Sequence, residues 1–253
     1  MRIAIIGKGA IAGFVGDKIA ETPGLELAGR VLRHEVPGAV TDVADLPPID
    51  LLIDCAGHEG LAAHGARALG RGIDVLTLSL GALADDGLAQ TLSDAATRSG
   101  ATLHLASGAI GALDALRAAQ VGGLDRVTYT GRKPPAGWRG SPAEVALDLD
   151  AVTSPATHFR GSARDAALHY PKNANVAAAV ALAGAGFDTT QVTLVADPHA
   201  PGNIHEITAE GRFGHLHFQI TGNSLPDNPR SSALAAMSGV AAILQATSPI
   251  RFT

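Results

Sequence analysis

A polar cluster between two apolar runs is the stretch of this chain best suited to chemistry. It spans Ala196 to Ile207 and reads ADPHAPGNIHEI. The run before it, Gln191 to Val195, and the run from His205 to Ala209 have the β-branched or alternating composition of strands. Proline and glycine between them predict a loop. Because loops held by rigid strands often carry catalytic side chains, this loop is the first candidate site.

His205 is the residue of this cluster best suited to catalysis. A histidine titrates near neutral pH, so it can transfer a proton or polarise a substrate group during hydride transfer. It lies two residues after Asn203 and directly before Glu206. A structural histidine in a strand would give the same pattern, and the cluster alone does not separate the two readings. His199 is read as an ordinary loop residue.

The start of the chain predicts a dinucleotide-binding turn. An apolar run, Arg2 to Ile6, breaks at GKGAIAG, Gly7 to Gly13, and a helical pattern follows. Strand, glycine turn and helix are the context that the GxGxxG/A fingerprint requires. Gly7 would allow the tight turn, Gly9 the approach of a pyrophosphate, and Ala12 close helix–strand packing. An ordinary strand–helix turn is the alternative. The candidate cofactor contacts at the turn are Gly7, Gly9, Ala10, Ile11 and Ala12.

The end of the second predicted strand, Leu25 to Leu32, bears on the choice of cofactor. An acid about twenty residues past the glycines is expected to bind the ribose 2′-OH of NAD. Here Arg33 follows Leu32, with no acid at the strand end. A guanidinium suits a 2′-phosphate, so NADP, alone or alongside NAD, is the predicted cofactor. Glu35 leaves room for an enzyme that uses only NAD.

Three further apolar runs continue the strand–helix rhythm: Ile49 to Asp54, Ile73 to Leu78, and Ala101 to Ala106, with a helix near Asp85 to Ser99. This rhythm predicts a doubly wound parallel sheet of the Rossmann type, which binds ligands at the carboxyl ends of its strands. Small residues there would leave room for a cofactor, although tight turns would look the same. The candidate contacts are Cys55, Ala56, Ser107, Gly108 and Ala109.

Beyond Gly111 the pattern changes to that of an α+β domain. The predicted helices are Ala112 to Ala119, Ser162 to Leu168 and Asn173 to Ala183. The predicted strands are Arg126 to Thr130, Thr189 to Ala196, Ile204 to Phe213 and His215 to Thr221, which look antiparallel, with a Pro/Gly-rich loop from Gly131 to Trp138. We predict a dinucleotide-binding domain, 1–110, on which a C-terminal helix within 231–253 packs, and a substrate, catalytic and dimerisation domain, 111–230.

Polar residues after Tyr170-Pro171 are further candidates for ligand binding. Asn173 or Asn175 would cap the following helix, or an amide would hold the nicotinamide carboxamide or ribose. Lys172, Arg164 and Arg132 could anchor a substrate carboxylate, although each could equally be a solvated surface charge. The candidate substrate contacts are Lys172, Asn203 and His205.

Composition bounds the class of protein. A net charge of −5 without a basic run argues against nucleic acid as the main partner. The single Cys55 excludes an internal disulfide framework and fits a reducing cytoplasm. The apolar start reads as a buried strand rather than a signal peptide, and Val176 to Ala185 is too short for a bilayer span. We expect a cytoplasmic protein without a bound metal, because the ten histidines match no zinc motif.

The sequence resembles the L-aspartate dehydrogenase family over nearly its whole length. Several long segments in one order are more specific than a glycine fingerprint alone. They are GKGAIAG (Gly7 to Gly13), DCAGHEG (Asp54 to Gly60), LSLGALAD (Leu78 to Asp85), SGAIGALDAL (Ser107 to Leu116), TGRKPP (Thr130 to Pro135), YPKNANVAAAVALAG (Tyr170 to Gly184), ADPHAPGNIHEI (Ala196 to Ile207) and GNSLPDNPRSSALAA (Gly222 to Ala236).

This resemblance implies NAD(P)-dependent oxidative deamination of L-aspartate to iminoaspartate, then oxaloacetate and ammonia, or the reverse. Iminoaspartate is also a precursor in pyridine nucleotide biosynthesis. The implied fold is a Rossmann domain plus a catalytic α+β domain like that of dihydrodipicolinate reductase, usually in a homodimer. By motif match, His205 takes the family's active-site histidine, and Ala109 and Asn175 take its dinucleotide-contact positions. Leu32 stands where an acid is expected, which argues against strict NAD preference.

Two other functions are compatible with the residues. One is a reductase of another amino-acid pathway on the same fold, such as a dihydrodipicolinate or homoserine-type enzyme. The other is a non-catalytic sensor that binds a dinucleotide. The sensor would leave the polar cluster before His205 without a purpose, but fold analogy alone excludes neither.

Overall fold

The computed structural model describes residues 1–225 and 228–252. These residues form two compact units, Met1–Ala106 with Ala235–Thr253 and Ser107–Leu234. The segment Gly222 to Ala236, which contributes to the family resemblance, includes residues 226–227, which lie outside the described residues.

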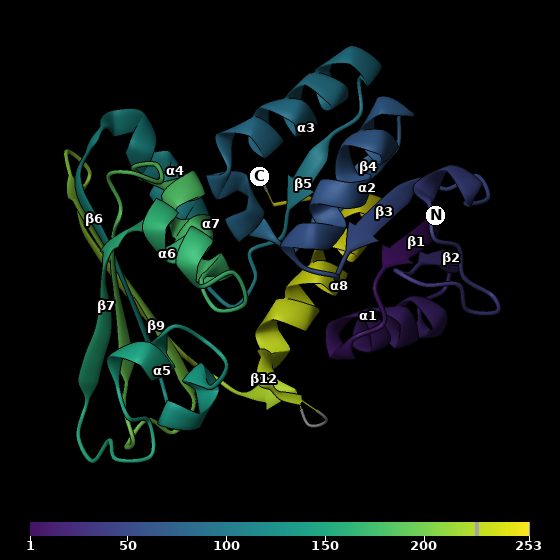
Figure 1. Cartoon of the computed structure of the whole chain (residues 1–253). Coiled ribbons are helices and arrows are strands. Elements are labelled where there is room, and N and C mark those ends of the chain that lie inside the picture. Colours follow the sequence, from purple (N-terminus) through teal and green to yellow (C-terminus); the bar gives the residue numbers. More distant parts are fainter. Residues whose placement is uncertain (226–227, 253) are drawn as a thin grey trace. The chain divides into compact units, whose positions relative to one another are not determined.

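The first unit contains a five-stranded parallel sheet (Figure 1). Its strands are β1 (Arg2–Ile6), β2 (Glu26–Val31), β3 (Leu51–Asp54), β4 (Asp74–Thr77) and β5 (Leu103–Leu105), in the order β2-β1-β3-β4-β5. All four neighbouring pairs are parallel. The strand order reverses at β1, because β2 lies on one side of β1 and β3 lies on the other. The carboxyl ends of β1 and β3 therefore form the switch point at which such sheets bind ligands. The predicted doubly wound sheet is confirmed.

The helices of this unit are α1 (Ala10–Glu21), α2 (His58–Gly70), α3 (Asp86–Ser99) and the C-terminal α8 (Ala233–Thr247). Ile243 of α8 belongs to the same buried cluster as Ile3, Ile5 and Val15. The C-terminal helix thus completes the core of the first unit. Short 3₁₀ turns lie at Val43–Asp45 and Leu80–Ala84.

Helix α2 was not predicted, because its glycines lower helix propensity. The structure shows why glycine stands there. A Cβ on Gly60 would lie 2.5 Å from the Cβ of Ala56, and one on Gly65 would lie 2.8 Å from side-chain atoms of Leu61 and Leu92. Close packing against β3 and α3 therefore requires the residues that weaken the sequence signal for a helix.

The second unit contains a five-stranded mixed sheet in the order β10-β9-β6-β8-β7. The strands are β6 (Leu124–Lys133), β7 (Ala156–Ser162), β8 (Gln191–Ala196), β9 (Asn203–Gly211) and β10 (Gly214–Gly222). Helices α4 (Leu113–Gly122), α6 (Ala163–His169) and α7 (Asn175–Ala183) lie along one side of it (Figure 1). Smaller elements are the 3₁₀ turn Pro135–Trp138, α5 (Ala143–Ala146), β11 (Ser224–Leu225) and β12 (Asn228–Ser232).

Two expectations for this sheet were wrong. β6 and β8 are parallel, so the sheet is not wholly antiparallel. Residues 131–133 belong to β6 and not to a loop; the loop prediction followed the glycine and prolines, but the strand ends only before Pro134. β7 was also missed. Because β6 lies between β8 and β9, the loop of residues 197–202 crosses the carboxyl end of β6.

Among the described residues, no helix combines the length and apolar composition that a bilayer span needs.

Asp54 is a buried carboxyl at the carboxyl end of β3. It accepts hydrogen bonds from Ala56 N at 2.9 Å, Thr77 Oγ1 at 2.9 Å and Ser79 Oγ at 2.5 Å. Burial raises the pKa of this carboxyl, although the three donors act against that shift. The contacts join the carboxyl ends of β3 and β4.

Asp54→Ala should therefore destabilise the protein. It would leave the hydroxyls of Thr77 and Ser79 buried without an acceptor, at a cost of about 1–3 kcal/mol for each group that stays unpaired, and it would also free the part-buried N–H of Ala56. Urea unfolding would measure the loss. Asp50→Ala, at an exposed site before the same strand, is the control, because it removes only one exposed hydrogen bond, from Arg2 N, and no buried group. Equal free energies of unfolding for the two variants would show that the hydrogen bonds of Asp54 do not stabilise the fold.

Candidate active site

The glycine turn after β1 has the geometry of a phosphate-binding loop. Gly7 has a φ of +108°, and a Cβ there would lie 3.2 Å from the carbonyl oxygen of Cys55, so a side chain would be both strained and crowded. Gly9 precedes α1, which has no side-chain cap and no acid in its first turn. The N–H groups that begin α1, at Ala10 and Ile11, are thus available to an anion, and the turn fits a dinucleotide pyrophosphate.

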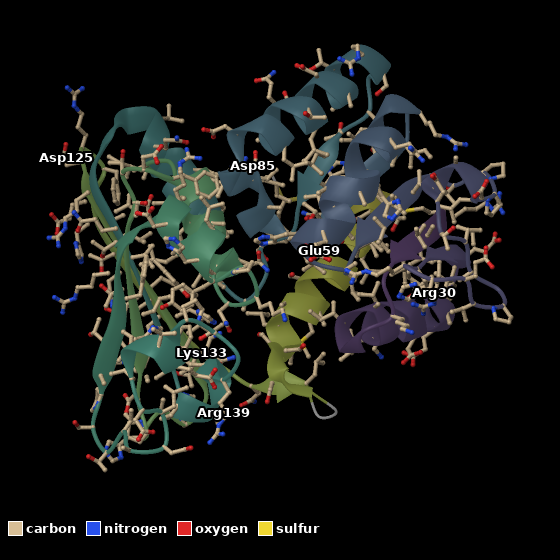
Figure 2. The ribbon with its side chains drawn as sticks, in the orientation of Figure 1. Arg30, Glu59, Asp85, Asp125, Lys133 and Arg139 are labelled. Carbon is tan, nitrogen blue, oxygen red and sulfur yellow. The ribbon has the colours of Figure 1, made fainter. Side chains whose placement is uncertain are left out.

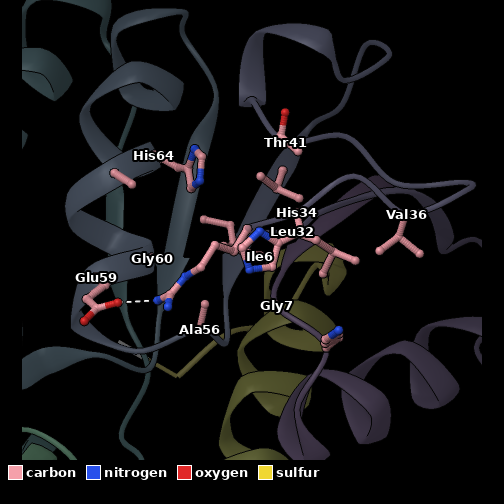
Figure 3. Close-up of a pocket in the computed structure, with 14 residues that line it drawn as sticks. Ile6, Gly7, Leu32, His34, Val36, Thr41, Ala56, Glu59, Gly60 and His64 are labelled. Carbon is pink, nitrogen blue, oxygen red and sulfur yellow. Dashed lines mark hydrogen bonds and ion pairs between the residues drawn. The ribbon is translucent and has the colours of Figure 1, made fainter.

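A cavity of about 440 Å³ lies beside this turn, at the carboxyl ends of β1 and β2 (Figure 3). Lys8 and Arg33 are its cationic side chains, His34 and His64 add two imidazoles, and Glu59 is its one acid. Glu59 forms an ion pair with Arg33, and both side chains are largely exposed. The cavity is therefore suited to a ribose that carries an anionic group. It is lined by Ile6, Gly7, Lys8, Val31, Leu32, Arg33, His34, Val36, Thr41, Ala56, Glu59, Gly60, Ala63 and His64.

The remaining candidates near the turn lie in different environments. Ala12 is fully buried against the sheet, so it serves helix–strand packing. Ala56 is exposed and lines the cavity. Cys55 is half-buried, and burial next to Asp54 raises the pKa of its thiol. The thiol stays protonated, which excludes an activated nucleophile at Cys55.

The other candidate cofactor contacts belong to the second unit. Ser107 is exposed, Gly108 has a φ of +70°, and Ala109 is buried in the loop before α4. Asn175 is the first residue of α7, and Ala174 occupies the capping position. Neither Asn173 nor Asn175 is therefore the cap.

His205 lies on β9 with only 3% of its surface exposed. Its Nδ1 atom is 2.7 Å from the phenol oxygen of Tyr129 on β6. Burial and the charge of Lys133 lower the pKa of His205 to about 3. The imidazole is consequently neutral near pH 7. This environment therefore disfavours a role in which a charged His205 aligns the substrate.

Lys133, labelled in Figure 2, is the last residue of β6. It is a buried cation that the sequence patterns did not single out. It is 8% exposed. Its Nζ donates a hydrogen bond of 3.1 Å to Asn173 Oδ1 and lies 4.7 Å from the centre of the Trp138 ring. Within residues 1–225 and 228–252 it forms no ion pair. Burial lowers the pKa of Lys133 to about 8. A buried amine without a carboxylate partner is a site prepared for an anion.

A signal for Lys133 was present in the sequence. Val127, Tyr129, Gly131 and Lys133 alternate along β6 and all face the buried side of the sheet. Extending this period-two pattern past Gly131 would have placed Lys133 inside.

The polar loop before His205 is tied to the end of β6. Asp197 donates its N–H to the carbonyl of Lys133 at 2.8 Å and accepts a hydrogen bond from Arg132 at 3.1 Å. The N–H of His199 donates to Asp197 Oδ1, and the His199 side chain is exposed. Asp197 and Arg132 thus brace the loop, so Arg132 is not a free anchor for a substrate carboxylate.

The remaining candidate substrate contacts lie in different environments. Arg164 pairs with Asp188 through two hydrogen bonds of 2.6 and 2.9 Å. Lys172 is exposed. Asn203 lines a cavity of about 360 Å³ within the second unit, together with Pro134, Ala136, Gly137, Pro201, Gly202, Gly222, Asn223 and Ser224. This cavity is formed by the segment that follows Lys133, the segment that precedes His205 and residues 222–224 at the end of β10.

The described residues contain no group of three or more His, Cys, Asp or Glu side chains that could hold a metal ion. His217 lies 3.2 Å from Glu206 and His215 lies 4.0 Å from Glu210, across the β9–β10 hairpin. His215 and His217 lie on one face of β10, and each faces a glutamate of β9 at the surface.

Each of the two units matches a known protein family. Residues 7–106 match the NAD binding domain of homoserine dehydrogenase, and residues 114–246 match the family described as aspartate dehydrogenase, C-terminal. A nucleotide-binding turn on a doubly wound sheet, joined to an α+β unit with a buried lysine and histidine, defines an NAD(P)-dependent oxidoreductase.

Individual relatives narrow this class. The chain is 56% identical to an L-aspartate dehydrogenase of Ruegeria pomeroyi, over 99% of this chain and 94% of the relative. It is 45% identical to one of Cupriavidus taiwanensis, over 96% of each. A crystal structure of aspartate dehydrogenase from Thermotoga maritima superposes with a TM-score of 0.74 at 26% identity, covering 100% of this chain and 99% of that one. The chain belongs to the L-aspartate dehydrogenase family.

Proposed function

We propose that this protein oxidises L-aspartate at Cα with NAD(P), giving iminoaspartate and, after hydrolysis, oxaloacetate and ammonia, or that it runs the reverse reductive amination. The observation that carries the substrate choice is the buried pair of Lys133 and His205. A cation without a counter-charge and a neutral imidazole suit a dicarboxylate substrate. The family to which the chain belongs supports the same substrate.

Lys133 is the proposed anchor for one substrate carboxylate. Its charge has no carboxylate partner among the described residues, and Asn173 holds its Nζ in place. A bound carboxylate would supply the missing counter-charge. Asn203 and Lys172 are the further proposed substrate contacts; Asn203 lines the adjoining cavity, and Lys172 directly precedes Asn173.

His205 is the proposed catalytic residue. Its Nδ1 is engaged by Tyr129, and no described residue hydrogen-bonds its Nε2, which is left for the substrate. The neutral ring excludes repulsion between His205 and Lys133. Held beside the reacting carbon, the imidazole would orient the substrate or exchange a proton with it.

When bound, the nicotinamide cofactor would supply the acceptor for the hydride from Cα of the substrate. We propose that Gly7, Gly9 and the start of α1 hold the pyrophosphate and that Arg33 binds the adenosine ribose or its 2′-phosphate. Ser107 to Ala109 and Asn175 are proposed contacts for the nicotinamide end. The proposed cofactor is NAD, NADP or both, and Arg33 favours NADP.

Arg33→Gln should weaken binding of NADPH by roughly tenfold or more, since one charge-assisted hydrogen bond contributes about 1.5–3 kcal/mol. Binding of NADH should change little, because it has no 2′-phosphate. Nucleotide fluorescence titration measures both. Glu59→Gln is the matched control: it removes the ion-pair partner of Arg33 and should strengthen NADPH binding. An equal loss for both nucleotides in Arg33→Gln would show that Arg33 does not read the 2′ position.

A substrate panel with NAD and with NADP tests the function. L-aspartate should support reduction of the cofactor, whereas L-homoserine and other amino acids should not. Activity only with homoserine or dihydrodipicolinate would replace this assignment by a neighbouring reductase. Nucleotide binding without any L-aspartate-dependent reduction would instead indicate a dinucleotide sensor.

We also propose that the enzyme works as a homodimer in the cytoplasm. The family resemblance supports the dimer, and the single cysteine suits a reducing compartment. Size-exclusion chromatography with light scattering tests the dimer directly.

A further inference from the structure

Tyr129 and His205 are neighbours across the ladder that joins β6 and β9. In this antiparallel register, Gly131 stands opposite His205 and Tyr129 stands opposite Ile207. Tyr129 is therefore a diagonal neighbour of His205 on the buried face of the sheet. An aromatic side chain can reach such a neighbour if nothing stands between the two.

Gly131 provides the space for this contact. A Cβ on Gly131 would lie 2.8 Å from the phenol oxygen of Tyr129, 3.2 Å from its Cζ and 3.1 Å from a methyl of Leu194. Any larger residue would push the phenol away from His205. The glycine thus lets the tyrosine ring lie along β6 and place its hydroxyl 2.7 Å from Nδ1 of His205.

The direction of this hydrogen bond follows from burial. Tyr129 is 1% exposed, and burial raises the pKa of its phenol, so the hydroxyl keeps its proton. Within the part of the chain that the structure describes, the phenol oxygen has no hydrogen-bond partner other than His205. If Nδ1–H donated to Tyr129, the phenol proton would be buried without an acceptor, which is costly. Tyr129 O–H therefore donates to Nδ1.

This direction decides the state of the histidine. A neutral imidazole carries one proton, so a ring that accepts at Nδ1 carries its proton on Nε2. We propose that Tyr129 is a positioning residue that keeps His205 neutral with the proton on Nε2, so that His205 donates a hydrogen bond to a substrate carboxylate oxygen. The proposal rests on the proposed function only for the identity of that carboxylate. Lys133 and the Nε2–H group then present two donors to one anionic substrate.

Long-range ¹H–¹⁵N correlation spectra of protein with ¹⁵N-labelled histidine report which ring nitrogen carries the proton. The spectrum of His205→Ala identifies the His205 signals among the ten histidines. The wild-type protein should show His205 with a protonated Nε2 and an unprotonated Nδ1 at pH 7. A protonated Nδ1 would overturn the proposal, and this measurement on the wild-type protein needs no substrate.

Tyr129→Phe keeps the ring but removes the donor. His205 should then populate both tautomers, and kcat should fall by roughly 3- to 10-fold, the scale of one net hydrogen bond, with cofactor affinity unchanged. Unchanged tautomer and kcat would contradict a positioning role. Tyr170→Phe is the matched control, because it removes the hydroxyl that lies 3.2 Å from Nδ1 of His158, a second tyrosine–histidine pair. It should leave the His205 signals in place.

Gly131→Ala tests the space itself. It should displace the phenol and reproduce the tautomer change of Tyr129→Phe, and the double variant should lose no more kcat than the more impaired single variant. Multiplied losses would show that the two residues act separately and would contradict the shared hydrogen bond. If wild-type protein does not oxidise L-aspartate, the proposed function fails, whereas the tautomer result stands on its own.

Discussion

His205→Ala should lower kcat for L-aspartate oxidation by roughly 10²-fold or more, the scale of a lost catalytic hydrogen-bonding or proton-transfer group. Cofactor binding should be retained, because the glycine turn and its cavity belong to the first unit and His205 belongs to the second. Steady-state kinetics and nucleotide titration measure the two properties on one preparation.

The matched control is His199→Ala in the same polar loop. The His199 side chain is exposed, and only its backbone N–H contacts Asp197. That variant should keep nearly normal kcat. A near-normal kcat in His205→Ala would contradict the assignment of His205 as the catalytic residue.

Lys133→Met should lose substrate binding and gain stability. Truncating one partner of a buried charge pair costs about 2–5 kcal/mol, so binding of succinate, an unreactive dicarboxylate, should weaken by roughly 30-fold or more. The free protein, in contrast, no longer has to bury an unpaired ammonium group. A residue that costs stability and supports binding is the signature of a functional buried charge.

The stability gain should depend on pH. Folding lowers the pKa of Lys133 from 10.5 to about 8, so burial of the charged form destabilises the folded state. That cost is fully present below about pH 8 and disappears as the pH rises towards 10.5. At roughly 1.4 kcal/mol per pKa unit, Lys133→Met should gain about 3 kcal/mol at neutral pH and nothing at the alkaline end.

Urea unfolding of Lys133→Met at several pH values, with isothermal titration of succinate, checks both effects. Lys172→Met is the control for stability, because Lys172 is exposed and should show no gain. Unaltered succinate affinity in Lys133→Met would remove Lys133 from the substrate site.

The first unit could be read from the sequence because its signals are local. Strands β1, β3 and β4 lie in short apolar runs, and the glycine turn after β1 has a conformation that requires Gly7. Helix α2 escaped because the glycines that let it pack against β3 are the residues that weaken helix propensity.

The candidate site of the second unit could be located from the sequence, but its contacts could not be predicted. The pattern around His205 indicated a strand after a polar loop, and the structure has both. Lys133 was missed because Gly131 and the prolines after it read as a loop, although β6 continues through Lys133. The partner of His205 lies 76 residues away, and only the register between β6 and β9 brings Tyr129 to it.

Transfer of deuterium from L-aspartate labelled at Cα tests the central claim most directly. Wild-type protein incubated with this substrate and NADP, or NAD, should produce reduced cofactor that carries one deuterium on the nicotinamide ring, as read by mass spectrometry, together with oxaloacetate and ammonia. Reduced cofactor without deuterium, or no reduced cofactor with either nucleotide, would contradict hydride transfer from Cα of L-aspartate.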